Sequence, residues 1–141
     1  MKRFHALIAA CTTSLVGLAA CSSSSAPGGD ACDVTVDRAC TPAYEPTFDN
    51  LFQKTFKPSC ALSGASCHAP EGRKAGLVFE NADTAHRLLL DGRVTAGKPE
   101  CSLLTRRILS TDTAFMMPPG LALAPGEQCA IIQWMARGAQ R

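Results

Sequence analysis

Cysteine is the residue that most constrains how this chain can fold, because the sequence holds eight cysteines in 141 residues. Two of them, Cys11 and Cys21, lie in or directly after an apolar N-terminal stretch. The other six lie in the part expected to fold: Cys32, Cys40, Cys60, Cys67, Cys101 and Cys129. An even number in a small exported domain favours disulfides, and six cysteines allow fifteen pairings. Proximity along the chain predicts the pairs Cys32 with Cys40, Cys60 with Cys67, and Cys101 with Cys129.

The N-terminal stretch, residues 1–20, is predicted to be a lipoprotein signal peptide. It has a positive start, and its apolar run over residues 6–20 is too short to span a membrane. The run ends in Leu-Ala-Ala-Cys, which resembles the site of the bacterial lipoprotein signal peptidase, so we expect Cys21 to carry lipid. The alternative is an ordinary cleaved signal with Cys21 as a plain thiol. Ser22, rather than an acidic residue, resembles outer-membrane sorting, and we expect a lipid-anchored protein facing the periplasm or the cell surface.

The charge balance gives no reason to expect a nucleic acid partner. Lys2 and Arg3 are two of the fourteen basic residues, which leaves twelve basic against twelve acidic residues after the signal. A neutral chain of this kind has no basic patch for phosphates. The sequence also shows no nucleophile with a base, no paired carboxylates and no phosphate-binding glycine loop, so we expect no enzyme.

After the signal, the chain divides into a flexible tether, residues 21–46, and a compact domain, residues 47–141. Residues 22–31 read SSSSAPGGDA and have no apolar face, and Pro42 and Pro46 discourage regular structure further on. A domain of roughly 95 residues can bury one small core, which at this size usually needs disulfides or a cofactor.

The compact domain is predicted to be all-α, with about four helices and long loops. Four segments have apolar residues at helical spacing: 48–56, 82–91, 103–109 and 125–137. Local signals mark their ends, with Thr47 and Asn81 as N-caps, Pro125 as a first helical residue, and Pro58, Gly92 and Gly138 as terminators. The short run GLVFE, residues 76–80, is expected to be extended.

The residues that carry chemistry are Cys-His at 67–68 and Met-Met-Pro-Pro far downstream at 116–119. A c-type haem site needs thiols that add to the haem vinyl groups, a histidine that binds iron, and a second ligand, often methionine. Gly64 stands where the first cysteine of a C-x-x-C-H motif belongs, and the nearest upstream cysteine is Cys60.

The order of these motifs resembles a small bacterial class I cytochrome c domain of the planctomycete type. The resemblance rests on the aromatic first helix, the Cys-His pair, the MMPPG run and the C-terminal PGEQCAIIQWMARGA, and it covers about residues 48–139. It implies a cytochrome c-like fold whose C-terminal helix packs across the N-terminal one. It also implies haem c as the cofactor, with Cys67 as the thioether residue. His68 would be the proximal iron ligand and Met117 the distal one, with Met116 as the alternative distal ligand.

Three interpretations of Cys60 stay open at this stage. Cys60 and Cys67 both attach haem through a stretched C-x6-C-H motif, or Cys67 attaches it alone, or the two form a disulfide in a fold that has lost its haem. Closing that loop by a disulfide would stabilise the fold by about 2 to 3 kcal/mol. The even cysteine count favours the disulfide, whereas the retained Met117 favours haem, although methionine also fills irregular cores.

The remaining candidates are weaker. His86 is expected to face solvent, and Arg106 and Arg107 are expected on a solvated helix face. A zinc site built from the Cys60 to His68 region with His86 would match no finger spacing.

The leading prediction is therefore one-electron transfer by haem c, with His68 and Met117 as axial ligands and another periplasmic or surface redox protein as the partner. The alternative is a haem-free, disulfide-stabilised cytochrome c-like module with a binding or structural role in the cell envelope.

Overall fold

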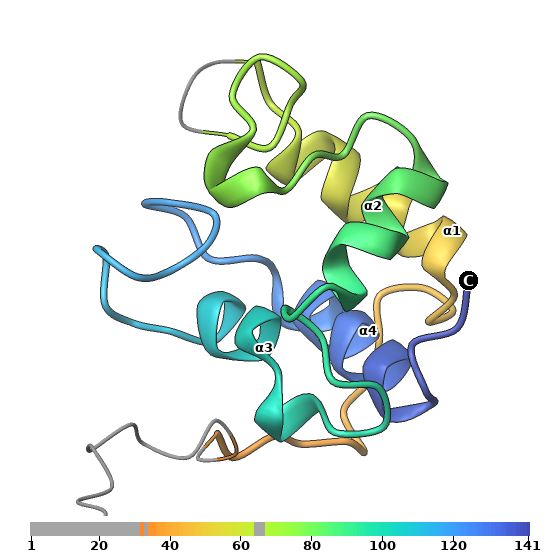
Figure 1. The fold of residues 1–141 in the computed structure, drawn as a ribbon. Helices are drawn as coiled ribbons and strands as arrows, with labels where there is room; N and C mark the ends of the chain where they lie inside the picture. Colours follow the sequence, from red (N-terminus) through yellow and green to blue (C-terminus); the bar gives the residue numbers. More distant parts are fainter. Residues whose placement is uncertain (1–31, 33, 64–66) are drawn as a thin grey trace, which may run out of the picture.

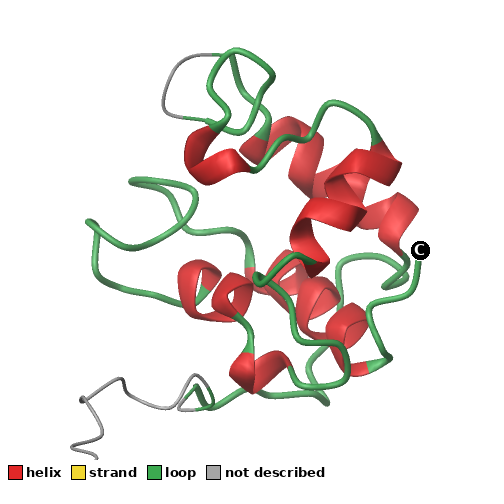
Figure 2. Ribbon diagram, viewed as in Figure 1, coloured by secondary structure: helices red, strands yellow, loops and turns green. Residues whose placement is uncertain are grey.

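The structure, a computed structural model, describes residues 32, 34–63 and 67–141. These residues form four α-helices, three short 3-10 or π-helical segments and long loops, and this part of the chain contains no strand (Figures 1 and 2). The elements in chain order are α1 (Phe48–Leu51), η1 (Phe52–Cys60), η2 (Lys74–Gly76), α2 (Ala82–Leu90), η3 (Pro99–Cys101), α3 (Leu103–Ile108) and α4 (Pro125–Ala136). The all-α prediction is confirmed. The predicted signal peptide and the lipid-bearing Cys21 lie outside the described residues.

The helices begin where local capping groups predict. The Thr47 side chain accepts a hydrogen bond from the Asn50 amide at 3.4 Å, and Asn81 caps α2 through the Thr84 amide at 2.9 Å. Helix α4 begins at Pro125, whose missing amide hydrogen costs nothing at a first helical position. These three starts are confirmed.

The end predicted for the first helix is wrong, because the helix continues through Pro58 to Cys60. It does so as the wider π-helical turn of η1, in which the Ala61 amide donates to the Phe56 carbonyl at 3.0 Å, five residues back. In an α-helix a proline ring collides with the carbonyl four residues earlier. A π turn forms hydrogen bonds between residues five apart instead of four, so it accommodates the proline ring. As a consequence Cys60 is the last residue of a helix that is held in the core.

The core forms where α4 packs across α1, as the resemblance implied. The Phe48 ring lies 5.3 Å from the Trp134 ring, and both side chains are buried. His86, expected in solvent, instead stacks edge-on against Phe48 at 4.8 Å and hydrogen-bonds the Ala139 carbonyl through Nε2 at 2.8 Å. The expectation failed because the residues that cover this side of α2 come from α1 and the C-terminal end, which are distant in sequence.

The disulfides differ from the pairing predicted by proximity. Cys32 bonds Cys101 and Cys40 bonds Cys129, over sequence separations of 69 and 89, while Cys60 and Cys67 form no disulfide. The predictions Cys32–Cys40, Cys60–Cys67 and Cys101–Cys129 were therefore wrong. The physical reason is that the segment before α1 folds back along α4 and η3, which brings cysteines together that are far apart in sequence.

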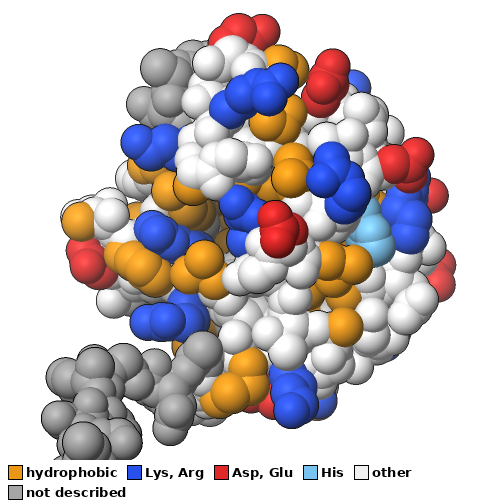
Figure 3. All heavy atoms as spheres, in the orientation of Figure 1, with side chains coloured by type: hydrophobic (Ala, Val, Ile, Leu, Met, Phe, Trp, Pro, Cys, Tyr) orange, Lys and Arg blue, Asp and Glu red, His pale blue; other side chains and the backbone are white. Residues whose placement is uncertain are grey.

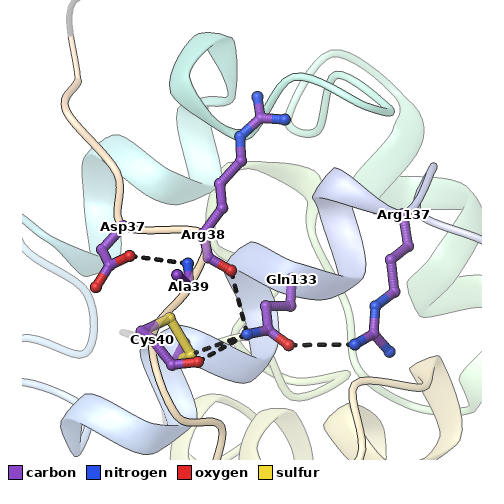
Figure 4. Close-up of a disulfide and its surroundings, with 7 residues drawn as sticks. Asp37, Arg38, Ala39, Cys40, Gln133 and Arg137 are labelled. Atoms are coloured by element: carbon purple, nitrogen blue, oxygen red, sulfur yellow. Dashed lines mark hydrogen bonds between the residues drawn. A yellow bond between two sulfur atoms is a disulfide. The ribbon is translucent and has the colours of Figure 1, made fainter.

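This returning segment, residues 34–46, is bound to the domain, unlike the flexible tether predicted up to residue 46. Gln133 of α4 donates from Nε2 to the Cys40 carbonyl at 2.8 Å, beside the Cys40–Cys129 disulfide (Figure 4). The Ala43 amide donates to the Gly126 carbonyl at 2.9 Å, and a Cβ on Gly126 would lie only 3.0 Å from Ala43. Glycine is required there because the two backbones approach so closely.

No helix among the described residues has the length and apolar character needed to cross a membrane.

Candidate functional site

A cavity of about 460 Å³ lies between η1, α2, α3 and the loops that precede α2 and α4. Figure 1 shows these two loops on the same side of the helical core. The cavity wall is mostly apolar and includes Phe56, Leu77, Phe79, Leu89, Ile108 and Leu123. Its size falls within the range of small-molecule and cofactor sites. On the face drawn in Figure 3, hydrophobic side chains are exposed among Lys and Arg.

His68 lines this cavity and its ring is oriented by the loop that follows it. The ring donates from Nδ1 to the Lys74 carbonyl at 3.1 Å, and its edge packs on the Phe79 ring at 5.8 Å between centroids. Burial lowers the pKa of His68 below its ordinary value. A neutral imidazole whose Nδ1 hydrogen is already bound leaves Nε2 as an electron-pair donor, which is the state that a metal-binding histidine requires.

Cys60 and Cys67 line the same cavity as His68, and neither is bonded to another cysteine. The His68 amide donates to the Cys60 carbonyl at 3.0 Å, so the end of η1 lies directly beside the Cys67-His68 pair. Burial, followed by the negative charge of Glu127 and the neighbouring Cys67, raises the pKa of Cys60 to about 12. Cys60 is therefore a protonated thiol at neutral pH.

Met117 reaches the cavity from the loop before α4, whereas Met116 is not among the lining residues. The Met117 amide donates to the Arg107 carbonyl at 2.9 Å. The Arg107 guanidinium in turn donates to the Phe115 carbonyl at 2.9 Å and lies 3.9 Å from the centre of the Phe115 ring. These contacts attach the loop to α3 and hold the Met117 backbone at the cavity.

Sequence reasoning missed three basic residues at the cavity: Lys74, Arg93 and Arg107. Arg107 is half-buried, so its placement on a solvated helix face was wrong, because the loop that covers it was not foreseen. Arg93 donates to the carbonyls of Leu88 at 2.8 Å and of Ala75 at 2.6 Å. It thereby joins the end of α2 to the loop that orients His68. Its acceptors are backbone carbonyls, so no residue pattern could have predicted the contact.

Other groups in the described part of the chain offer less chemistry. A second hollow of about 480 Å³ lies beside Phe48, Asp49 and Arg141 and contains none of the predicted site residues. His86 is not at the cavity, and the described residues contain no group of three or more His, Cys, Asp or Glu side chains placed to hold a metal ion.

The fold and the site together resemble those of small helical cytochrome c-like domains. An aromatic N-terminal helix lies under a tryptophan-bearing C-terminal helix, and an apolar cavity gathers Cys67, His68 and Met117. In agreement, residues 65–120 match the family model described as planctomycete cytochrome C. The match includes all three residues and begins after Cys60. No curated protein and no solved structure matches the chain.

Proposed function

We propose that the cavity binds haem c and that the protein transfers single electrons. The observation that carries this proposal is the convergence of Cys67, His68 and Met117 on one apolar cavity, although Met117 lies far from the other two in sequence. The set contains a thiol, an imidazole and a thioether, which are the donors that a c-type haem with histidine–methionine ligation uses. When bound, haem supplies the one-electron Fe(III)/Fe(II) couple.

Each residue has a separate task in this proposal. Cys67 would hold haem covalently, and His68 would offer Nε2 as an iron ligand because its Nδ1 hydrogen is bound to the Lys74 carbonyl. Met117 would supply a thioether ligand, which would raise the reduction potential relative to stronger donors. The apolar wall excludes water and keeps the dielectric constant around the cofactor low.

The haem-free alternative loses its main structural support. That interpretation needed a Cys60–Cys67 disulfide as a replacement for the cofactor, and the two cysteines are not bonded to each other. The structure does contain two disulfides, but both lie between the N-terminal segment and the region of η3 and α4.

The setting of this activity is also a proposal, and it is supported by the sequence alone. Residues 1–20 carry the features of a lipoprotein signal, and Cys21 is the candidate lipid-bearing residue. A lipid anchor in the bacterial outer membrane would place the domain beside periplasmic or surface redox proteins, which are the proposed electron-transfer partners. Globomycin treatment of the native cells, which blocks the lipoprotein signal peptidase, should leave the precursor unprocessed.

The proposed function is tested with the full protein isolated from the cells that produce it. We expect a reddish protein whose haem absorption stays with the polypeptide after denaturation, together with a reversible one-electron redox titration. A colourless protein would overturn the proposal.

The two adjacent methionines provide a matched pair of variants for the ligand assignment. Met117→Ala should lower the reduction potential by an amount on the order of tenths of a volt, since axial ligands tune haem potentials over a range of about 0.8 V. Met116→Ala should leave the potential unchanged. The reverse result would assign the ligand to Met116.

A further inference from the structure

We propose that Cys60 is a second haem-attachment residue, so that the attachment motif of this protein is C-x6-C-H, with thioethers at both Cys60 and Cys67. This inference rests on the proposed function and goes beyond it, since the family match begins only at residue 65. The sequence left three interpretations of Cys60 open, and the geometry favours this one.

The first argument is that Cys60 lies beside the Cys67-His68 pair despite its distance in sequence. The His68 amide donates to the Cys60 carbonyl at 3.0 Å, which closes the intervening chain into a loop. Leu62, which lies between the two cysteines in sequence, is about half exposed, at 53%. The insertion therefore lengthens the chain between the two cysteines without separating them from the same cavity.

The second argument is that Cys60 is held at the cavity by helix contacts on its other side. It is the last residue of η1, and Thr55 one turn earlier is fully buried. Thr55 donates from Oγ1 to a Glu127 carboxylate oxygen of α4 at 2.9 Å and also hydrogen-bonds the Tyr44 hydroxyl. These part-buried hydrogen bonds hold η1 against α4, which keeps Cys60 at the cavity wall.

The third argument concerns the use of the cysteines. Of the six cysteines in the described residues, four form disulfides and only Cys60 and Cys67 do not. An exported protein meets an oxidising compartment, in which neighbouring thiols normally become a disulfide. Because Cys60 and Cys67 are not bonded to each other, both thiols remain available for another reaction at the cavity.

That reaction is the addition of a thiol to a haem vinyl group. The Cys60 S–H bond breaks, the sulfur forms a bond to one vinyl carbon, and the hydrogen passes to the other vinyl carbon. The C=C double bond becomes a single bond, and nothing leaves. The addition is redox-neutral overall, so it requires no oxidant. Cys67 reacts with the second vinyl group in the same way.

Trypsin provides a direct test, because both cysteines fall on one peptide. Cleavage after Lys54 and Arg73, with Lys57 protected by the following Pro58, releases residues 55–73. The native protein would be denatured, reduced, alkylated with iodoacetamide, digested and sequenced by mass spectrometry. We expect residues 55–73 to carry one haem and no alkyl group. Alkylation of the four disulfide cysteines after reduction is the internal control.

The other outcomes are distinct from one another. One haem together with one alkyl group on Cys60 would overturn this inference and leave the proposed function intact. No haem and two alkyl groups after reduction would overturn both. A Cys60→Ala variant should keep haem on Cys67 but show the pyridine haemochrome band of a haem with one remaining vinyl group, at longer wavelength than in the native protein. An unchanged band would also contradict attachment through Cys60.

Discussion

Replacement of Cys40 and Cys129 by alanine is expected to destabilise the protein by about 4 kcal/mol or more. The two disulfides interleave, with sequence separations of 69 and 89. With Cys32–Cys101 intact, the shortest covalent path from Cys40 to Cys129 runs through that bridge and contains about 36 residues. The chain-entropy relation assigns about 4 kcal/mol to the closure of such a loop in the unfolded state.

The second bridge is a matched control for the first. With Cys40–Cys129 intact, Cys32 and Cys101 close the same path, so their removal carries the same entropic cost of about 4 kcal/mol. The packing differs, because the Cys129 side chain is only 2% exposed and Cys32 is exposed. The small cavity left at Cys129 should add about 1 kcal/mol to the first pair.

Urea unfolding of the wild-type protein and both double variants measures these differences by linear extrapolation. The expected order of stability is wild type, then Cys32→Ala/Cys101→Ala, then Cys40→Ala/Cys129→Ala. A loss below about 1 kcal/mol for both double variants would refute the loop argument. A reversed order of the two variants would refute the packing argument.

Three further predictions concern single residues. Gly126→Ala should lower the free energy of unfolding by about 1 to 3 kcal/mol in a thermal or urea melt, because the new Cβ would collide with Ala43. Unchanged stability would contradict that close contact. Arg93→Met should lower the free energy of unfolding in urea by about 2 to 3 kcal/mol, because its hydrogen bonds to the carbonyls are lost. The control, Arg87→Met on the exposed side of α2, should lower it by less than about 0.5 kcal/mol. Equal losses of stability in the two variants would contradict the role of Arg93. The last prediction concerns haem-free protein, secreted without the maturation pathway. Burial, Glu127 and Cys67 keep the folded Cys60 thiol protonated until about pH 12, whereas the unfolded thiol ionises from about pH 8.5. The free energy of unfolding should therefore fall between about pH 8.5 and 12, by up to about 1.4 kcal/mol per pH unit. Cys60→Ala should reduce that slope in urea melts, and an identical slope would contradict the burial of the thiol.

Features that depend on neighbouring residues could be predicted from the sequence. Thr47 and Asn81 cap amides three residues away, and Pro125 opens α4 with its own ring. The helical class and the packing of the C-terminal helix on the N-terminal helix were likewise predictable from the apolar spacing and the family resemblance.

Features that depend on distant segments were not predictable. Cysteine pairing failed because the segment before α1 returns along α4, which no local pattern indicates. His86 was misplaced because the Phe48 and Trp134 rings cover it from other helices. The helix end predicted at Pro58 was wrong because the π turn that accommodates this proline leaves no clear signal in the sequence.

The candidate site combines both kinds of information. The sequence motifs identified His68 and Met117 as candidate ligands, and in the structure both residues line one cavity. The roles of Arg93 and of the Cys60 carbonyl came only from the structure, because both act through backbone groups.

The most direct test of the central claim is a crystal structure of the protein from its native cells, with anomalous diffraction recorded at the iron absorption edge. We predict one iron atom in the cavity, bound by His68 Nε2 and Met117 Sδ, with the porphyrin joined to the Cys67 sulfur. An anomalous map without iron in that cavity, or iron bound by other residues, would contradict the assignment.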